Sequence, residues 1–176
     1  MPVWALAFVD ASEDCRVLDV GCGGGANVAR LLEKFPKSTV TGMDVSTLAI
    51  EKSSNLNNKP IVDGRCYIIG GNALQIPQAK ETYDLVTAFE TIYYWSSLEL
   101  GASEAFRVLK PGGTLVIGNE LDGLQPSDRE LEKATGIMRV YSIDEILQDL
   151  TEAGFTDFNT HHDEERHFIC VTARKP

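Results

Sequence analysis

Residues 16–25 read RVLDVGCGGG, an apolar run that passes directly into a loop with four glycines in five residues. The run 16–20 predicts a buried strand. The apolar spacing after Gly24, which ends at Pro36, predicts a helix. In α/β folds a glycine-rich loop between the first strand and the first helix is a ligand site, because glycine lets the backbone turn tightly and approach a ligand closely. We therefore interpret this loop as a binding loop rather than as a plain turn.

The rest of the chain alternates strand-like and helix-like segments. Further strands are predicted at residues 38–44, 65–70, 83–89, 114–118, 155–160 and 167–173. Helices are predicted at residues 46–56 and 96–109 and from a capping box that begins at Ser142, with a turn at 111–113. Such alternation predicts an α/β fold, a Rossmann-like seven-stranded and mostly parallel sheet with helices on both faces. The closing hairpin adds an antiparallel C-terminal strand.

Composition limits the classes of function. The 176 residues suit a single domain, 1–176, and 43% hydrophobic residues suffice for a core. A net charge of -10 argues against nucleic acid as a partner, and no apolar run is long enough to span a membrane. The four cysteines form no C-x-x-C pair, so no metal site is expected. Without a secretory signal, we expect a cytoplasmic protein with reduced thiols.

Two kinds of ligand compete for the glycine loop. Gly21, Gly23 and Ala26 also fit the dinucleotide fingerprint, and Asp44 suits a ribose hydroxyl with either ligand. Asp19 discriminates better, because a carboxylate ~5 Å from a pyrophosphate is repelled by about 3 kcal/mol per charge. A ligand with an ammonium and a sulfonium is attracted instead. Asp19 also has a structural alternative, in which it accepts hydrogen bonds from the loop amides, and the two roles can coexist.

Four stretches, in this order and spacing, resemble the class I S-adenosylmethionine-dependent methyltransferases. The likeness is closest to the broad small-molecule group that includes the quinone-biosynthesis enzymes (methyltransferase type 11), and it covers nearly the whole chain from Val17. The stretches are VLDVGCGGG at 17–25, GMDVS at 42–46, GNA at 71–73 with Ile76-Pro77, and RVLKPGG at 107–113.

The resemblance implies S-adenosyl-L-methionine as cofactor, S-adenosyl-L-homocysteine as product, and a set of binding residues. Asp19, Gly21, Cys22 and Gly23 would lie along the methionine moiety, Asp44 would bind the ribose hydroxyls, Val45 would pack on adenine, Asn72 would bond its amino group and Ala73 would offer a backbone amide. Relatives more often have Asp at position 72, and the neutral amide predicts modestly weaker adenine binding. Asn72 has an alternative role as a turn residue after two glycines.

Glu90 follows the fourth predicted strand, where relatives contact the amino-acid end of the cofactor or the acceptor. The aromatic residues Tyr93, Tyr94 and Trp95 come next, and by the same resemblance they lie over the expected methyl group. They either stack on an acceptor and exclude water or pack the start of the following helix. Both interpretations stay open at this stage.

Two segments lie outside the shared pattern. Residues 1–15 resemble the last part of an N-terminal helical lid that closes over the cofactor in relatives. We therefore expect a more open site with weaker cofactor retention. Residues 121–140 are polar and weakly periodic, and they are predicted to form a surface insertion over the strand ends.

The predicted function is methyl transfer to an unidentified, small-molecule acceptor. An activated methyl donor needs mainly alignment and a dry site, so a general base is required only if the acceptor must lose a proton. Candidate bases are Glu90, His161, His162 and His167. A non-catalytic cofactor-binding module and an NAD-dependent oxidoreductase are the alternatives. The sequence fixes neither the acceptor nor the oligomeric state.

Overall fold

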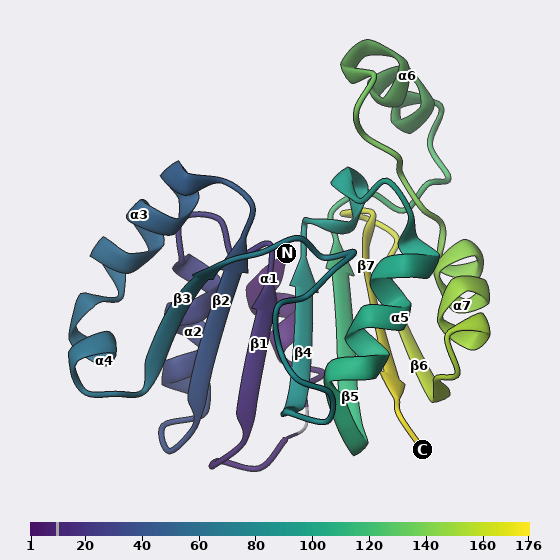
Figure 1. The fold of residues 1–176 in the computed structure, drawn as a ribbon. Coiled ribbons are helices and arrows are strands. Elements are labelled where there is room, and N and C mark those ends of the chain that lie inside the picture. The colour runs from purple at the N-terminus through teal and green to yellow at the C-terminus, as the bar shows by residue number, and fades with distance from the viewer. Residues whose placement is uncertain (10) are drawn as a thin grey trace.

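The computed structural model describes residues 1–9 and 11–176. Its centre is a seven-stranded sheet with the strand order β3-β2-β1-β4-β5-β7-β6 (Figure 1). The strands are β1 (Arg16–Val20), β2 (Thr39–Asp44), β3 (Cys66–Gly70), β4 (Tyr83–Phe89), β5 (Leu109–Asn119), β6 (Thr156–Asp163) and β7 (Phe168–Arg174). All neighbours pair in parallel except β7, which runs antiparallel to both β5 and β6. The predicted fold class is confirmed.

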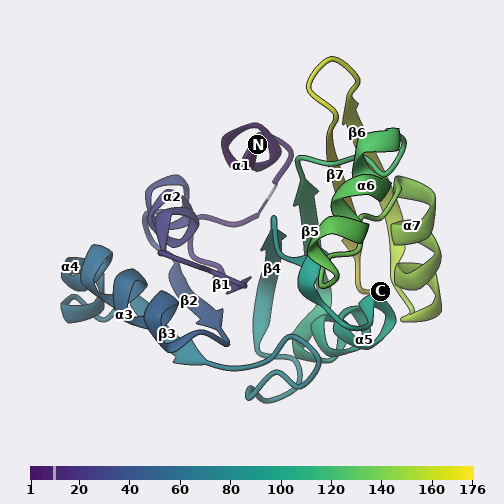
Figure 2. The same cartoon turned by 90° about the horizontal axis from the view of Figure 1, so that it is seen from above.

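Helices cover both faces of the sheet. They are α1 (Pro2–Leu6), α2 (Ala26–Lys34), α3 (Thr47–Leu56), α4 (Asn58–Val62), the short 3₁₀ helix η1 (Ile92–Tyr94), α5 (Leu98–Val108), α6 (Pro126–Thr135) and α7 (Ile143–Glu152). Viewed from above, α1 to α4 lie on one side of the sheet and α5 and α7 lie on the other (Figure 2). No helix among the described residues is long and apolar enough to cross a membrane.

Central strands form where the sequence is apolar on both faces. Every residue of β4 except Asp84 is buried, and so is every residue of β1 after Arg16. Their side chains contribute to two apolar clusters, one containing Leu18 and Val86 and the other containing Val17 and Leu85. Because each strand is covered on both sides, its sequence is a continuous apolar run rather than an alternating one.

The site is positioned by a reversal of strand order. From β1 the chain moves outward to β2 and β3, and then it returns to place β4 on the other side of β1. The loops that leave the carboxyl ends of β1 and β4 therefore diverge. In open α/β sheets a ligand crevice forms at such a switch point. Asp19 near the end of β1 is directly paired with Thr87 of β4.

Several predicted boundaries need correction, and among them β6 extends to Asp163 rather than ending at residue 160. The turn predicted at residues 111–113 lies inside β5, which begins at Leu109 instead of residue 114. Leu109 pairs with Tyr83 and Thr114 pairs with Leu85, so the intervening residues form an irregularity in the pairing with β4 rather than a free turn. The helix predicted at 96–109 is shorter, since Ser97 is the N-cap of α5 and accepts a hydrogen bond from the Leu100 amide.

Residues 121–140 contain a helix that the sequence pattern did not reveal. α6 stands beyond the carboxyl end of the sheet (Figure 1). It begins with a capping box formed by Gln125 and Asp128. The more usual capping box has Ser or Thr at the first of these positions and Glu or Gln at the second. Asp122, at the base of this segment, is 2% exposed. Its Oδ2 lies 3.1 Å from His162 Nε2 and 3.0 Å from His167 Nδ1, so the segment is tied to the β6–β7 hairpin.

Candidate functional site

The glycine loop has a backbone conformation that only glycine accepts easily. Gly21 has φ 72° and Gly23 has φ 52°, both in the left-handed region. The amides of Gly21 and Cys22 donate to the carbonyl of Met43 at 2.8 and 3.0 Å. A Cβ at Gly21 would collide with the Thr91 side chain. The loop is therefore held between the ends of β2 and β4 by contacts that a larger residue would break.

Asp44 connects the loop to the start of α3. Its Oδ2 accepts a 2.9 Å hydrogen bond from the Gly23 amide, and its Oδ1 accepts one of 2.9 Å from the Ser46 amide. Each carboxylate oxygen has a second lone pair, so Asp44 keeps the capacity to accept from a vicinal diol. Asp44 therefore accepts a hydrogen bond from a loop amide, which is the structural role that the sequence left open for Asp19.

Asp19 is 1% exposed, and its environment differs from the structural alternative drawn from the sequence. Its Oδ1 accepts a 2.7 Å hydrogen bond from the Thr87 hydroxyl rather than from a loop amide. Its Oδ2 is buried without a hydrogen-bond partner. Burial raises the pKa of Asp19 to about 7, with a further contribution from the charge of Asp44. Asp19 is therefore a buried carboxyl with one unpartnered oxygen, and its hydrogen bonds do not shape the loop.

A cavity of about 420 Å³ opens beside the loop, at the carboxyl ends of β1, β2 and β4. Its walls are Val20, Gly21, Met43, Asp44, Val45, Gly71, Asn72, Ala73, Leu74, Glu90, Thr91, Tyr94, Trp95 and Ser96. The structure thus brings together residues from three of the four stretches that carry the resemblance, and the stretch at 107–113, for which no cofactor contact was predicted, does not line the cavity. The walls include two carboxylates and no Lys, Arg or His.

Glu90 lies at the end of the cavity formed by β4. Its backbone has φ 58°, a left-handed conformation that is uncommon for a residue with a side chain. Its Oε1 is buried without a partner. Burial, followed by the nearby charge of Glu120, raises the pKa of Glu90 to about 7. A strained backbone and an unpaired carboxyl oxygen in one residue are typical of a functional position.

Asn72, Ala73 and Val45 form the part of the cavity nearest β2 and β3. Asn72 Oδ1 accepts a 2.9 Å hydrogen bond from the Leu74 amide, so the alternative turn role of Asn72 is realised. That oxygen keeps one lone pair, so the turn and an adenine contact are compatible. Val45 is 71% exposed, which leaves an apolar surface available to a ring. Ala73 is buried against the core.

The three aromatic residues have different environments, although the rings of Tyr93 and Tyr94 meet edge to face with their centroids 6.3 Å apart. Tyr93 is 3% exposed, and its hydroxyl oxygen accepts a 3.1 Å hydrogen bond from the Leu121 amide. Trp95 packs against Gly101 in α5, where any Cβ would collide with its ring. Tyr94 is 57% exposed and lines the cavity. Packing is therefore the role of Tyr93, Trp95 has both packing and cavity contacts, and Tyr94 is the ring most accessible to a ligand.

Some predicted residues lie behind the cavity wall instead of in it, and Asp19 and Tyr93 are among them. Cys22 is 4% exposed, and burial raises the pKa of its thiol to about 12. Gly23 uses its amide to bind Asp44. None of the three histidines lines the cavity: His161 stacks on Phe8 at 3.6 Å between ring centroids, and the other two bind Asp122. Of the four candidate bases, Glu90 alone lines the cavity.

Thr91, Leu74 and Ser96 line the cavity but were missed from the sequence. Thr91 could have been predicted from its place directly after Glu90. Its contact with Gly21 could not, because that contact depends on β4 lying beside β1. Leu74 and Ser96 lie in loops next to predicted residues, and nothing in their side chains indicates a ligand.

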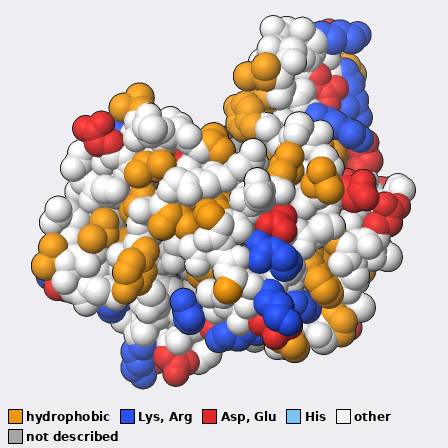
Figure 3. Space-filling view, in the orientation of Figure 1, with side chains coloured by type: hydrophobic (Ala, Val, Ile, Leu, Met, Phe, Trp, Pro, Cys, Tyr) orange, Lys and Arg blue, Asp and Glu red, His pale blue; other side chains and the backbone are white. Residues whose placement is uncertain are grey.

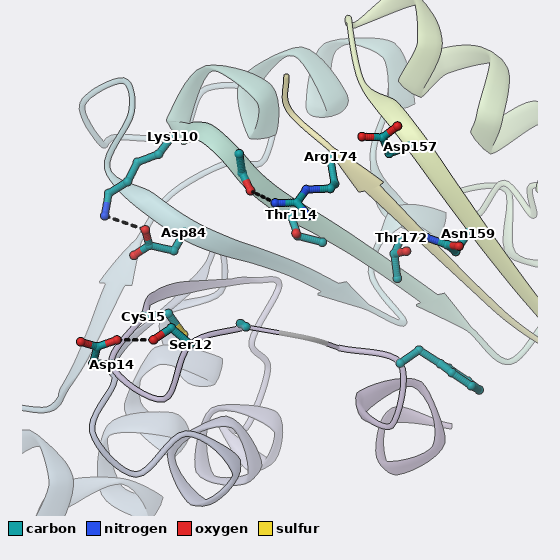
Figure 4. A pocket seen from close by; sticks show the side chains of 13 residues that line it. Ser12, Asp14, Cys15, Asp84, Lys110, Thr114, Asp157, Asn159, Thr172 and Arg174 are labelled. Carbon is teal, nitrogen blue, oxygen red and sulfur yellow. Dashed lines mark hydrogen bonds and ion pairs between the residues drawn. The ribbon is translucent and has the colours of Figure 1, made fainter.

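A second cavity, of about 700 Å³, lies at the opposite edge of the sheet, at the amino ends of β1, β4 and β5 (Figure 4). Its charged walls are largely paired internally, as in the 2.7 Å ion pair of Lys110 with Asp84. It contains none of the residues predicted to bind a cofactor. Among the described residues no cluster of three or more His, Cys, Asp or Glu is suited to hold a metal ion.

Comparisons with known proteins agree with this geometry. A family model described as "Methyltransferase domain" matches residues 18–117, more than half of the chain. The 27-O-demethylrifamycin SV methyltransferase of Amycolatopsis mediterranei is 32% identical over 145 residues, which are 79% of this chain and 53% of that protein. Sterol 24-C-methyltransferase of Kluyveromyces lactis is 29% identical over 152 residues, 81% of this chain and 41% of that protein.

The chain spans about half the length of these curated relatives. The solved structure of Haemonchus contortus phosphoethanolamine N-methyltransferase 2 with S-adenosyl-L-methionine superposes with a TM-score of 0.87 at 18% identity. That match covers 99% of this chain and 52% of the other, and it supports the fold. The family predicted from the motifs is thus confirmed, and the chain belongs to the methyltransferase-domain family.

Proposed function

We propose that this chain binds S-adenosyl-L-methionine in the 420 Å³ cavity and transfers its methyl group to a small-molecule acceptor. The observation that carries the proposal is Glu90 Oε1, a buried carboxyl oxygen without a partner on a residue that lines the cavity, together with a second such oxygen, Asp19 Oδ2, on the strand that leads into the glycine loop. Buried polar atoms are nearly always paired, so these two call for a donor from a ligand. A cationic amino-acid ligand supplies one, whereas a pyrophosphate supplies none and is repelled.

The residues present fit the parts of this cofactor. In the proposal Asp19, Gly21 and Glu90 bind the methionine end, with Cys22 and Gly23 shaping the loop behind it. The two oxygens of Asp44 accept from the ribose hydroxyls. Val45 packs on the adenine ring, while Asn72 and the amide of Ala73 bond its edge. When bound, the cofactor supplies an activated methyl group on a sulfonium.

The protein contributes alignment and exclusion of water. Tyr94, Trp95 and Thr91 form the wall next to Glu90, and we assign Tyr94 and Trp95, supported by the buried Tyr93, to acceptor contact. Glu90 is the candidate for a base where the acceptor must lose a proton, since a carboxyl with a pKa of about 7 exchanges protons readily at neutral pH. Cavity walls without cations also support an acceptor other than a nucleic acid.

The remaining assignments concern the whole chain. We propose that residues 1–176 act as one methyltransferase domain, with 1–15 belonging to an N-terminal lid segment and 121–140 forming an insertion over the strand ends. We further propose a cytoplasmic location. All four cysteines are buried and unpaired, as expected of a reducing compartment.

Isotope-labelled S-adenosylmethionine tests the activity. The protein is incubated with the labelled cofactor and small-molecule extracts, and S-adenosylhomocysteine and labelled product are followed by mass spectrometry. We expect both to form, and we expect Asp44→Asn to abolish both while the fold is kept. Tight binding of the cofactor without any product across broad extracts would instead favour a non-catalytic binding module.

A further inference from the structure

Asn119, the last residue of β5, is a buried residue that the proposed function does not use. It lies at the carboxyl end of the sheet, where the surface is hollowed between α6 and the α3 side of the molecule (Figure 3), yet it is 0% exposed. Its Nδ2 and Oδ1 are both buried without a hydrogen-bond partner among the described residues. No other side chain in residues 1–9 and 11–176 has two such atoms. Because buried polar atoms are nearly always paired, this amide calls for an explanation.

The residues on either side of Asn119 both contact Glu90. The Glu90 amide donates a 2.9 Å hydrogen bond to the Gly118 carbonyl. Burial is the main cause of the raised pKa of Glu90, and hydrogen bonding from the Glu120 backbone to its carboxyl acts against that rise. Since Phe89 is paired with Gly118, Glu90 comes opposite Asn119 where β4 and β5 end.

Tyr93 belongs to the same buried polar region. A hydrogen bond from its side chain also acts to lower the pKa of Glu90, against burial and the charge of Glu120. Its hydroxyl oxygen accepts a 3.1 Å hydrogen bond from the Leu121 amide, two residues beyond Asn119. The Glu90 carboxyl therefore lies against the short stretch of backbone that carries the Asn119 side chain.

The free atoms of Glu90 and Asn119 are complementary. Within the part of the chain that the structure describes, Glu90 Oε1 is an acceptor without a donor and Asn119 Nδ2 is a donor without an acceptor. The terminal torsion of an asparagine side chain is broad, so the amide can turn without movement of the backbone. A hydrogen bond to an ionised carboxylate is about twice as strong as one between neutral groups, so this turn is favoured when Glu90 loses its proton.

Nearby charges also act on Glu90. Burial and the charge of Glu120 raise its pKa to about 7, whereas the Met1 amino group, 3.4 Å from Glu120 Oε1, acts to lower it. A further donor therefore helps the carboxylate to form at neutral pH. A carboxylate offers about four acceptor positions, so the Asn119 amide and a cationic ligand can both donate to it.

We propose that Asn119 is a positioning residue for Glu90, whose amide turns to donate to the Glu90 carboxylate and holds that group in one orientation. The inference rests on the proposed function, in which Glu90 binds the methionine end of the cofactor or removes a proton from the acceptor. Asn119 does not line the cavity, so it acts through Glu90.

Two substitutions of nearly equal shape test the role of the amide. Asn119→Val removes the donor, whereas Asn119→Thr keeps a hydroxyl that can donate. Both β-branched residues suit a strand, and the melting temperature verifies that both variants fold. Should either not fold, the smaller pair Asn119→Ala and Asn119→Ser makes the same comparison. The titration of Glu90 is followed in the ligand-free protein by carbon-13 NMR of the side-chain carboxyls, with the Glu90 signal identified by its loss in Glu90→Gln.

We expect the titration midpoint of Glu90 to rise by about one pH unit in Asn119→Val, a roughly tenfold change in proton affinity, and by less than about half of that in Asn119→Thr. Asp19 is bonded to Thr87, so its midpoint should stay within about 0.3 pH units of the wild-type value in both variants. No change at Glu90, equal changes in the two variants, or an equal change at Asp19 would overturn the inference.

Calorimetric titration with S-adenosylhomocysteine separates this inference from the proposed function. A wild-type protein that does not bind S-adenosylhomocysteine contradicts the proposed function, and the NMR titration still decides whether Asn119 acts on Glu90. Where binding occurs, the affinity of Asn119→Val should begin to fall at a pH about one unit higher than in the wild type. An unchanged pH profile in that variant would count against the positioning role.

Discussion

The hydroxyl of Thr87 donates a 2.7 Å hydrogen bond to Oδ1 of Asp19, across the parallel pair of β4 and β1. The bond fixes the carboxyl group beneath the glycine loop and leaves Oδ2 buried without a partner. Because burial raises the pKa of Asp19 to about 7, much of the ligand-free protein carries this group in its neutral form at neutral pH. A cationic ligand favours the carboxylate, so binding and proton release are coupled.

Binding of S-adenosylhomocysteine is expected to depend on pH. Its ammonium group stabilises the ionised forms of Asp19 and Glu90, both of which have a pKa raised to about 7 in the free protein. Affinity should therefore fall as pH decreases below about 7 and reach a plateau above it, with protons released on binding near pH 6. Calorimetry between pH 5.5 and 8.5, in buffers of different ionisation enthalpy, measures both effects. A flat affinity profile without proton release would exclude this coupling.

The variant Asp19→Asn should change how stability depends on pH. The pKa of Asp19 is about 7 in the folded protein and 3.8 as the reference, so the folded state binds more protons between these values. Stability is therefore lost as pH rises from 4 to 7, and the amide variant escapes this loss. The difference in melting temperature, Asp19→Asn minus wild type, should become more positive from pH 4 to pH 8. Each kcal/mol by which the variant gains in free energy of unfolding over the wild type should raise this difference by roughly 2–4 °C. A difference that is constant with pH would contradict the assigned pKa direction.

Replacing Gly21 by alanine should disrupt the loop. Its φ of 72° strains a side chain, and the new Cβ would collide with Thr91. We expect a loss of about 2–4 kcal/mol in the free energy of unfolding and loss of cofactor binding. Urea denaturation and calorimetry measure the two effects. Gly24→Ala is the control, because its φ is ordinary and no atom lies within 4 Å of the added Cβ. If both variants behaved alike, the contact with Thr91 would not be what requires glycine.

Asp122→Asn should loosen the segment 121–140. Burial acts to raise the pKa of Asp122, but hydrogen bonds from the Leu124 amide, His167 and His162 outweigh it and lower the pKa below 3.8. The stabilisation is therefore present above that value and is lost as pH falls through the lower folded pKa. We expect a loss of about 1–3 kcal/mol at pH 7 and faster hydrogen exchange in residues 121–140. Asp63→Asn, at an exposed position directly after α4, is the control. Unchanged exchange in the Asp122 variant would show that the histidine contacts do not hold the segment.

Much of the fold could be predicted, because its signals are local. The strands at 16–20 and 83–89 are apolar on both faces, and the Ser142 capping box marks the start of α7 as expected. The start of β5 could not be predicted, since it depends on Leu109 pairing with Tyr83, a contact between distant parts of the chain. α6 was missed because its capping residues, Gln125 and Asp128, are an unusual pair.

The site was predictable where a residue type is demanded by the backbone or by the ligand. The glycine loop and Asp44 were found for that reason, and both border the cavity. The roles of individual side chains were less accessible. The sequence cannot show that Asp44, rather than Asp19, accepts the Gly23 amide, or that Tyr93 is buried while Tyr94 is exposed. Those outcomes depend on which strands lie side by side.

The most direct measurement is a comparison of S-adenosylhomocysteine with NADH by isothermal titration calorimetry at pH 7.5. A buried, unpartnered carboxyl at Asp19 predicts saturable one-to-one binding of S-adenosylhomocysteine, at least about 10-fold weaker in Asp19→Asn, and no measurable binding of NADH. Binding of NADH in preference to S-adenosylhomocysteine would contradict the account.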